Sequence, residues 1–143
     1  MRVLLHTCCG PCLIYPESVL RAEGMTVTAY FHNPNIHPFR EFKERLTACS
    51  AYLETLGMAS IIDQEYGLVP FLQSVVFRED ERCHICYAMR LEKTVELAGS
   101  LGFDGFSTTL LYSKYQNHQL IRTTAEMLAG KYGAAVLTIT VPR

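Results

Sequence analysis

Short apolar segments alternate with helical patterns along this chain, and this alternation constrains its fold most strongly. Five segments have the β-branched and aromatic composition of buried strands: 3–6, 26–31, 59–62, 103–109 and 135–140. Apolar residues recur at three- and four-residue spacing in the segments between them: 11–23, 39–56, 69–76, 81–100 and 116–132. The alternation predicts one α/β domain over residues 1–143, a three-layer, Rossmann-like parallel sheet of about five strands with helices on both faces.

Helix boundaries are marked by characteristic residues. Pro11 suits the first turn of a helix, and Gly24, Gly57 and Gly133 follow the expected ends of three helices. Asp80 is expected to be the N-cap of the helix that begins at position 81.

Composition excludes several classes of protein. The net charge of −1 gives no overall attraction to nucleic acid. No apolar run approaches the roughly 18 residues that a membrane helix needs, and the N-terminus is too short and polar for a signal peptide. We therefore expect a cytoplasmic protein without membrane association. In that compartment six cysteines favour metal or redox chemistry over disulfides.

Two cysteine pairs fall at places where a site is expected. Cys8 and Cys9 follow the first strand, at the carboxyl edge where α/β proteins bind ligands. Cys83 and Cys86 lie on one face of the first turn of a helix, where the helix dipole favours thiolates. Four thiolates on two loops can hold a tetrahedral metal ion or an iron–sulfur cluster. Adjacent cysteines are atypical of zinc ribbons, so iron–sulfur is favoured, with zinc and a metal-free thiol pair as alternatives.

Two further cysteines have different explanations. Cys12 makes a CxxC with Cys9, which is also the spacing of a thioredoxin-like dithiol. Alternatively Cys12 binds an additional metal ion, donates a proton, or is a partly buried bystander. Cys49 falls on the apolar stripe of its helix and is expected in the core.

Several blocks of the sequence resemble the QueH-type epoxyqueuosine reductases. They occur in the family's order, cover nearly all of the chain, and comprise residues 4–12, 31–38, 82–91, 108–113 and 117–118. The resemblance implies an adenine-nucleotide-hydrolase-like fold in which the cysteine loop replaces a phosphate-binding glycine loop. It also implies a [4Fe-4S] cluster on the two cysteine pairs: Cys8, Cys9, Cys83 and Cys86.

The activity implied by the resemblance is the last step of queuosine synthesis. Epoxyqueuosine at the tRNA anticodon wobble position loses its epoxide oxygen and becomes an alkene, with electrons from an unidentified donor. An acid must protonate the leaving oxygen, and the candidates are Cys12, His6, His84 and His118. An additional iron ion is a further candidate cofactor.

Substrate contacts are expected from residues in the segments that follow strands. Polar and aromatic side chains there can contact phosphates or stack on bases, although plain turns are an alternative explanation. The candidates are Asn35, His37, Thr108, Tyr112 and Lys114.

The chain departs from the family at its C-terminus. Family members continue for several dozen residues and end with a redox-active Cys-Gly-Cys pair, whereas this chain stops at Arg143. We therefore expect cluster binding with weak turnover from this chain alone. Two rival hypotheses remain: a non-enzymatic zinc- or cluster-binding module that grips RNA, and a cluster-free thiol oxidoreductase that uses Cys9 and Cys12.

Overall fold

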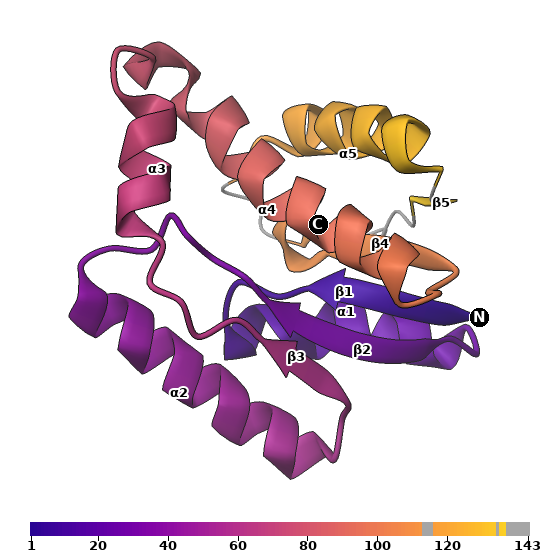
Figure 1. Ribbon diagram of the computed structural model, residues 1–143. Helices are drawn as coiled ribbons and strands as arrows, with labels where there is room; N and C mark the ends of the chain where they lie inside the picture. The colour runs from indigo at the N-terminus through magenta and orange to yellow at the C-terminus, as the bar shows by residue number, and fades with distance from the viewer. Residues whose placement is uncertain (113–115, 134, 137–143) are drawn as a thin grey trace.

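Strands and helices alternate along the chain in the predicted order (Figure 1). The computed structural model describes residues 1–112, 116–133 and 135–136. The elements are β1 (Arg2–His6), α1 (Gly10–Ala22), β2 (Thr26–Phe31), α2 (Phe39–Leu56), β3 (Ser60–Ile62), α3 (Leu68–Val75), η1 (Glu79–Glu81), α4 (Arg82–Ser100), β4 (Gly105–Thr108), η2 (Thr109–Leu111), α5 (His118–Tyr132) and β5 (Ala135–Val136). The part of the fifth strand predicted over 137–140 lies outside the described residues.

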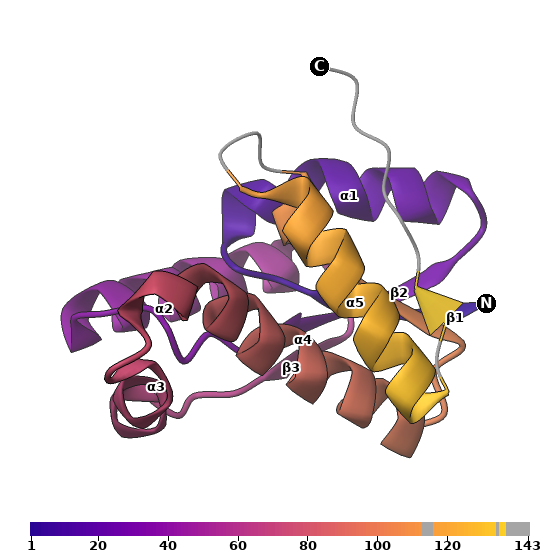
Figure 2. The same cartoon turned by 90° about the horizontal axis from the view of Figure 1, so that it is seen from above.

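The five strands form one parallel sheet in the order β3-β2-β1-β4-β5. The chain proceeds outwards from β1 to β3 and then returns to the other side of β1 at β4. Helices α1 and α2 therefore cover one face of the sheet, and α4 and α5 cover the other (Figures 1 and 2). This confirms the predicted three-layer α/β class. The loops after β1 and β4 diverge at the strand-order reversal, where ligands bind in such sheets.

The core consists of two layers because successive strand residues point to opposite faces of the sheet. Val3 and Leu5 of β1 pack with α1 and α2, while Leu4 packs with α4 and α5. Phe31 and Phe106 are fully buried in the two layers. Burial of each such side chain stabilises the fold by roughly 1.5–3 kcal/mol. Both core layers therefore stabilise the sheet whose carboxyl edge carries the candidate site.

The ends of the helices agree with the sequence predictions at the glycines and differ at Asp80. Gly57 and Gly133 take left-handed backbone angles, with φ of 61° and 69°, directly after α2 and α5. The predicted Asp80 cap is wrong. Asp80 lies inside the 3-10 turn η1, which continues into α4, so Glu81 takes the N-cap position without a side-chain cap.

The fourth strand, predicted over 103–109, spans Gly105–Thr108, and its carboxyl end is set by η2, which begins at Thr109. The Thr108 hydroxyl accepts a hydrogen bond from the Leu110 N–H and turns the chain there. Across the described ranges, none of the helices combines the length and apolar character that a membrane span requires.

Candidate metal centre at the carboxyl edge of the sheet

The cysteine loop follows β1 and leads directly into α1. Cys9 is the N-cap of α1 and Cys12 lies in its first turn. The Cys8 and Cys9 sulfurs are 3.9 Å apart, and the Cys9 and Cys12 sulfurs are 3.1 Å apart. All three sulfurs lie within 4.8 Å of one another, so the start of α1 brings Cys12, the CxxC partner of Cys9, beside the adjacent pair.

This group of three cysteines, the Cys8–Cys9–Cys12 group, has the chemistry of a metal site. A tetrahedral ion bound at about 2.3 Å to each sulfur places its sulfurs about 3.8 Å apart, close to the Cys8–Cys9 separation. Hydrogen bonds from Cys12 and then Cys9 lower the pKa of Cys8, while sharing its proton with Cys8 raises the pKa of Cys12. Cys8 is therefore the thiol that most readily becomes a thiolate, the form that binds metals.

Buried polar groups from two other strand ends anchor the cysteine loop. The Thr109 hydroxyl accepts the backbone N–H of Cys8 at 3.2 Å and donates to Cys8 Sγ at 3.4 Å. The Asn33 side-chain amide donates to the carbonyl oxygen of Thr7 at 3.1 Å. Asn33 and Thr109 are 2% and 0% exposed, so the side chains that make these bonds are themselves buried. They fix the backbone on which the sulfurs are carried.

His6, a candidate proton donor, is fully buried at the end of β1. Its Nε2 lies 3.0 Å from the carbonyl oxygen of His32, which can only accept, so Nε2 carries the proton. Nδ1 then accepts from the Thr108 hydroxyl at 2.9 Å. Burial, followed by the charge of Arg90, lowers the pKa of His6 to about 3. His6 is therefore a neutral ring that joins β1 to the ends of β2 and β4, and its role as a proton donor stays a prediction.

The second cysteine pair lies at the start of α4, as predicted. Cys83 is exposed and Cys86 is half-buried. Neither belongs to the Cys8–Cys9–Cys12 group, so the four-cysteine ligand set stays a prediction. Arg90, one turn further along α4, donates to Cys86 Sγ at 3.1 Å and to the Cys86 carbonyl at 3.4 Å. Burial raises the pKa of Cys86 although the Arg90 charge opposes that shift.

The predicted substrate residues lie in different environments. Thr108 is 1% exposed, and its hydroxyl is hydrogen-bonded to the His6 ring and to the Leu110 N–H. Asn35 is half-buried, and its side-chain oxygen is buried without a hydrogen-bond partner among the described residues. Tyr112 is exposed at the same edge of the sheet and stacks on Tyr15 with ring centroids 5.5 Å apart.

The remaining candidates lie on loops and helix starts. The half-buried His37 contacts Tyr66, with Nδ1 3.0 Å from the phenolic oxygen. His84 is exposed in the first turn of α4, and His118 is the first residue of α5. Lys114 lies outside the described residues.

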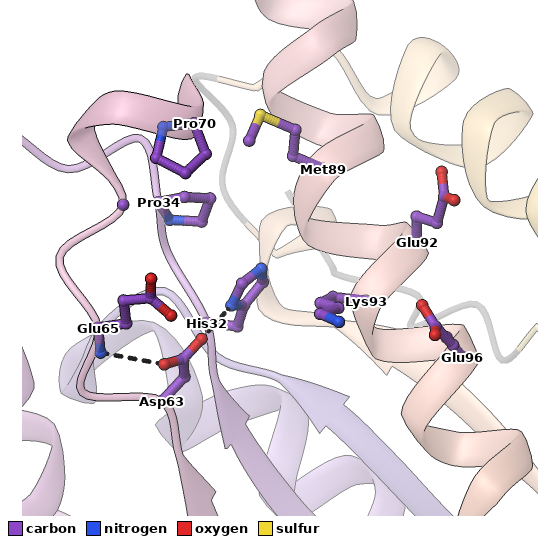
Figure 3. A pocket seen from close by; sticks show the side chains of 10 residues that line it. His32, Pro34, Asp63, Glu65, Pro70, Met89, Glu92, Lys93 and Glu96 are labelled. Atoms are coloured by element: carbon purple, nitrogen blue, oxygen red, sulfur yellow. Dashed lines mark hydrogen bonds and ion pairs between the residues drawn. The ribbon is translucent and has the colours of Figure 1, made fainter. Parts of the chain in front are cut away.

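A pocket of about 410 Å³ opens between the ends of β2 and β3 and helix α4 (Figure 3). Its lining includes Met89 and Lys93 of α4, which face His32 and Asp63 across the opening. Met89 follows Cys86 by three positions on the helix, so this wall starts one turn from a candidate metal ligand.

The pocket contains a His–Asp pair that the sequence analysis missed. His32 Nδ1 lies 2.7 Å from Asp63 Oδ2, and the other ring nitrogen faces the pocket (Figure 3). Burial lowers the pKa of His32, while Asp63 partly offsets that effect. The two residues directly follow the paired strands β2 and β3, since Phe31 and Ile62 are partners in the register. Their position after adjacent parallel strands is the signal that could have found them.

Comparison with known proteins places the chain in a family. The model of the family described as epoxyqueuosine reductase QueH matches residues 3–140. A protein of that name from Dehalococcoides mccartyi is 36% identical over 132 residues, which cover 92% of this chain and 72% of the relative. The proteins of that name from Histophilus somni and Haemophilus influenzae are 33% and 32% identical, over 94% and 92% of this chain. The chain spans only 57% and 55% of these two relatives.

A solved structure confirms the fold class. The protein described as a predicted subunit of a tRNA methyltransferase from Methanocaldococcus jannaschii superposes with a TM-score of 0.62 at 11% identity. The match covers 96% of this chain and 68% of that protein, and it supports the adenine-nucleotide-hydrolase-like fold that the sequence resemblance implied. With the family model matched over nearly its whole length, the chain belongs to the QueH family of epoxyqueuosine reductases.

Proposed function

We propose that this chain carries the metal-binding core of an epoxyqueuosine reductase acting on tRNA. In this reaction both C–O bonds of the epoxide break, and two electrons and two protons convert it to an alkene and water. The observation that carries the proposal is the gathering of Cys8, Cys9 and Cys12 at the strand-order reversal of a QueH-family chain. Cytoplasmic localisation and an external electron donor remain part of the proposal.

The donor set is suited to an iron–sulfur centre. Thiolates are the ligands that such clusters take, and both cysteine pairs lie near a helix N-terminus, which favours negative charge: one pair is around the N-cap of α1, and the other is in the first five residues of α4. We propose that Cys8, Cys9, Cys83 and Cys86 hold a [4Fe-4S] cluster. Cys12, 3.1 Å from Cys9, is then placed to bind an additional iron ion or to donate a proton. The cluster, when bound, supplies one-electron transfer.

Proton delivery has two groups of candidates. Cys12 and His118 remain candidates from the sequence, while His6 has both ring nitrogens engaged inside the protein. The structure adds His32, whose ring is oriented by Asp63 and faces the pocket. A histidine held by a carboxylate is a common proton-transfer arrangement, so we include His32 among the donors.

The substrate is proposed to enter along the carboxyl edge of the sheet. The 410 Å³ pocket beside α4 has room for part of a modified nucleoside. Tyr112 is exposed at this edge and can stack on a base. Asn35, His37, Thr108 and Lys114 remain proposed substrate contacts, although the Thr108 hydroxyl is buried and hydrogen-bonded to His6.

The activity is tested on tRNA that contains epoxyqueuosine. Cluster-loaded protein and a chemical one-electron reductant are incubated with this tRNA without oxygen, and its nucleosides are analysed by mass spectrometry. We expect a product that has lost one oxygen atom. The Cys8→Ser variant, treated in the same way, is expected to give no product. Complete absence of product from the loaded wild-type chain would remove the activity for this chain.

A further inference from the structure

Arg90 is a buried cation without a carboxylate partner. The residue is 5% exposed, and in the described part of the chain no Asp or Glu forms an ion pair with it. Its guanidinium donates hydrogen bonds to the Cys86 sulfur and the Cys86 carbonyl oxygen. A buried guanidinium is costly unless an anion compensates it, so this position calls for a negative partner.

Helix α4, which carries both Cys86 and Arg90, packs against β1, the strand that leads into the other cysteine segment. The sulfur that accepts the Arg90 hydrogen bond belongs to Cys86, a proposed ligand of the cluster. The guanidinium therefore lies against one of the sulfurs that would carry the negative charge of the bound cluster.

We propose that Arg90 is the counter-charge of the metal centre and holds the reduction potential of the bound cluster up. This inference rests on the proposed cluster. A reduced cluster is more negative than the oxidised one, so a nearby fixed cation stabilises the reduced form more. Hydrogen bonds to the sulfurs act in the same direction. Arg90 touches the Cys86 sulfur and acts through it, which makes it a positioning residue rather than a catalytic one.

A purely structural role makes a different prediction. The side chain of Arg90 also passes near Tyr87, with its guanidinium carbon 5.9 Å from the ring centroid. If Arg90 served only to pack α4, its replacement would lower stability and leave the potential of a loaded cluster unchanged. The potential therefore separates the two roles.

The test compares Arg90→Gln, Arg90→Lys and the control Arg40→Gln in the full chain. Arg40 is exposed on α2 and loses the same charge away from the site. Folding of each metal-free variant is checked by circular dichroism, iron and sulfide are counted after anaerobic reconstitution, and the midpoint potential is measured by redox titration.

We expect Arg90→Gln to lower the reduction equilibrium constant at least tenfold, a shift of 59 mV for one electron. Arg90→Lys should shift the midpoint potential less, because lysine keeps the positive charge. Failure of folded Arg90→Gln to load, with Arg90→Lys loading, also supports the counter-charge.

Equal potentials for Arg90→Gln and Arg40→Gln would overturn the inference and leave the proposed function intact. So would a tenfold shift in Arg90→Lys, or failure of both folded Arg90 variants to load, since either outcome shows that charge is not what matters. If Arg90→Gln does not fold, a tenfold shift in Arg90→Lys still overturns the inference. A wild-type chain that binds no cluster would remove the proposed cofactor and this inference together.

Discussion

The hydroxyl of Thr109 is hydrogen-bonded to both ends of Cys8: it accepts the backbone N–H at 3.2 Å and donates to Sγ at 3.4 Å. One side chain at the end of β4 thus fixes the backbone and the sulfur of a cysteine that follows β1. The two strands are neighbours at the point where the strand order reverses. The position of the candidate metal centre is a consequence of the sheet topology.

Thr109→Val is expected to destabilise the metal-free protein. Valine keeps the shape of threonine but leaves the half-buried Cys8 N–H without its acceptor, and an unsatisfied buried donor costs about 1–3 kcal/mol. Thr109→Ser keeps the hydroxyl and should lower the free energy of unfolding by less. Urea unfolding measures this free energy for both variants. Equal free energies of unfolding for wild type and Thr109→Val would show that this hydroxyl does not anchor the loop.

A matched pair of glycine substitutions tests the wall of the pocket. A Cβ on Gly67 would lie 2.5 Å from the Cβ of Pro34 and 2.9 Å from its Cα, so Gly67→Ala should lower stability by about 1–3 kcal/mol. Gly99, in the last turn of α4, has open space around it. Gly99→Ala should raise stability by roughly 0.5–1 kcal/mol. Thermal unfolding compares the stability of the two variants with that of the wild type. An unchanged stability in Gly67→Ala would contradict the close packing of Gly67 against Pro34.

The His32–Asp63 pair predicts a pH dependence. Burial holds the pKa of His32 below its usual value, so the unfolded chain binds more protons than the native one as the pH falls through about 6.5. Stability is therefore lost on acidification. Asp63→Asn removes the opposing carboxylate and should lower the His32 pKa further, measured by NMR titration of the ring. The control is Glu65→Gln, another pocket carboxylate. An unchanged or raised pKa in Asp63→Asn would contradict the pairing.

Cys49 should differ chemically from the candidate ligands. It is fully buried, and burial raises its pKa to about 11. At pH 8 in native metal-free protein we expect iodoacetamide to modify the exposed Cys83 and to leave Cys49 intact until denaturant is added. Peptide mass spectrometry locates the label. Early modification of Cys49 would place it outside the core.

The sequence predicted the strands and helices well because each buried element repeats its apolar pattern at the period of its own structure. Thr26–Phe31 is a strand over the predicted residues, and α2 ends before Gly57 as expected. Asp80 failed as a cap because a short 3-10 turn feeds α4, and no local residue pattern distinguishes such a turn from the helix itself.

The sequence predicted which site residues follow strands or begin helices. It predicted less well which side chains come into contact. Cys8 and Cys9 follow β1 as expected, and Cys83 and Cys86 lie near the start of α4. The closeness of Cys12 to Cys9 depends on how α1 starts. The meeting of His32 and Asp63 depends on packing between segments that are distant in the chain.

The central claim is that the two cysteine pairs hold an iron–sulfur cluster, and anaerobic iron and sulfide analysis tests it most directly. We predict roughly four irons per wild-type chain, from the stoichiometry of the cubic cluster, and loss of the cluster in Cys83→Ser with retention in the core variant Cys49→Ser. Cys12→Ser separates the alternatives, because a single metal ion on the Cys8–Cys9–Cys12 group would be lost in that variant and kept in Cys83→Ser. A full complement of iron in Cys83→Ser, or one zinc and no iron in the wild type, would contradict the account.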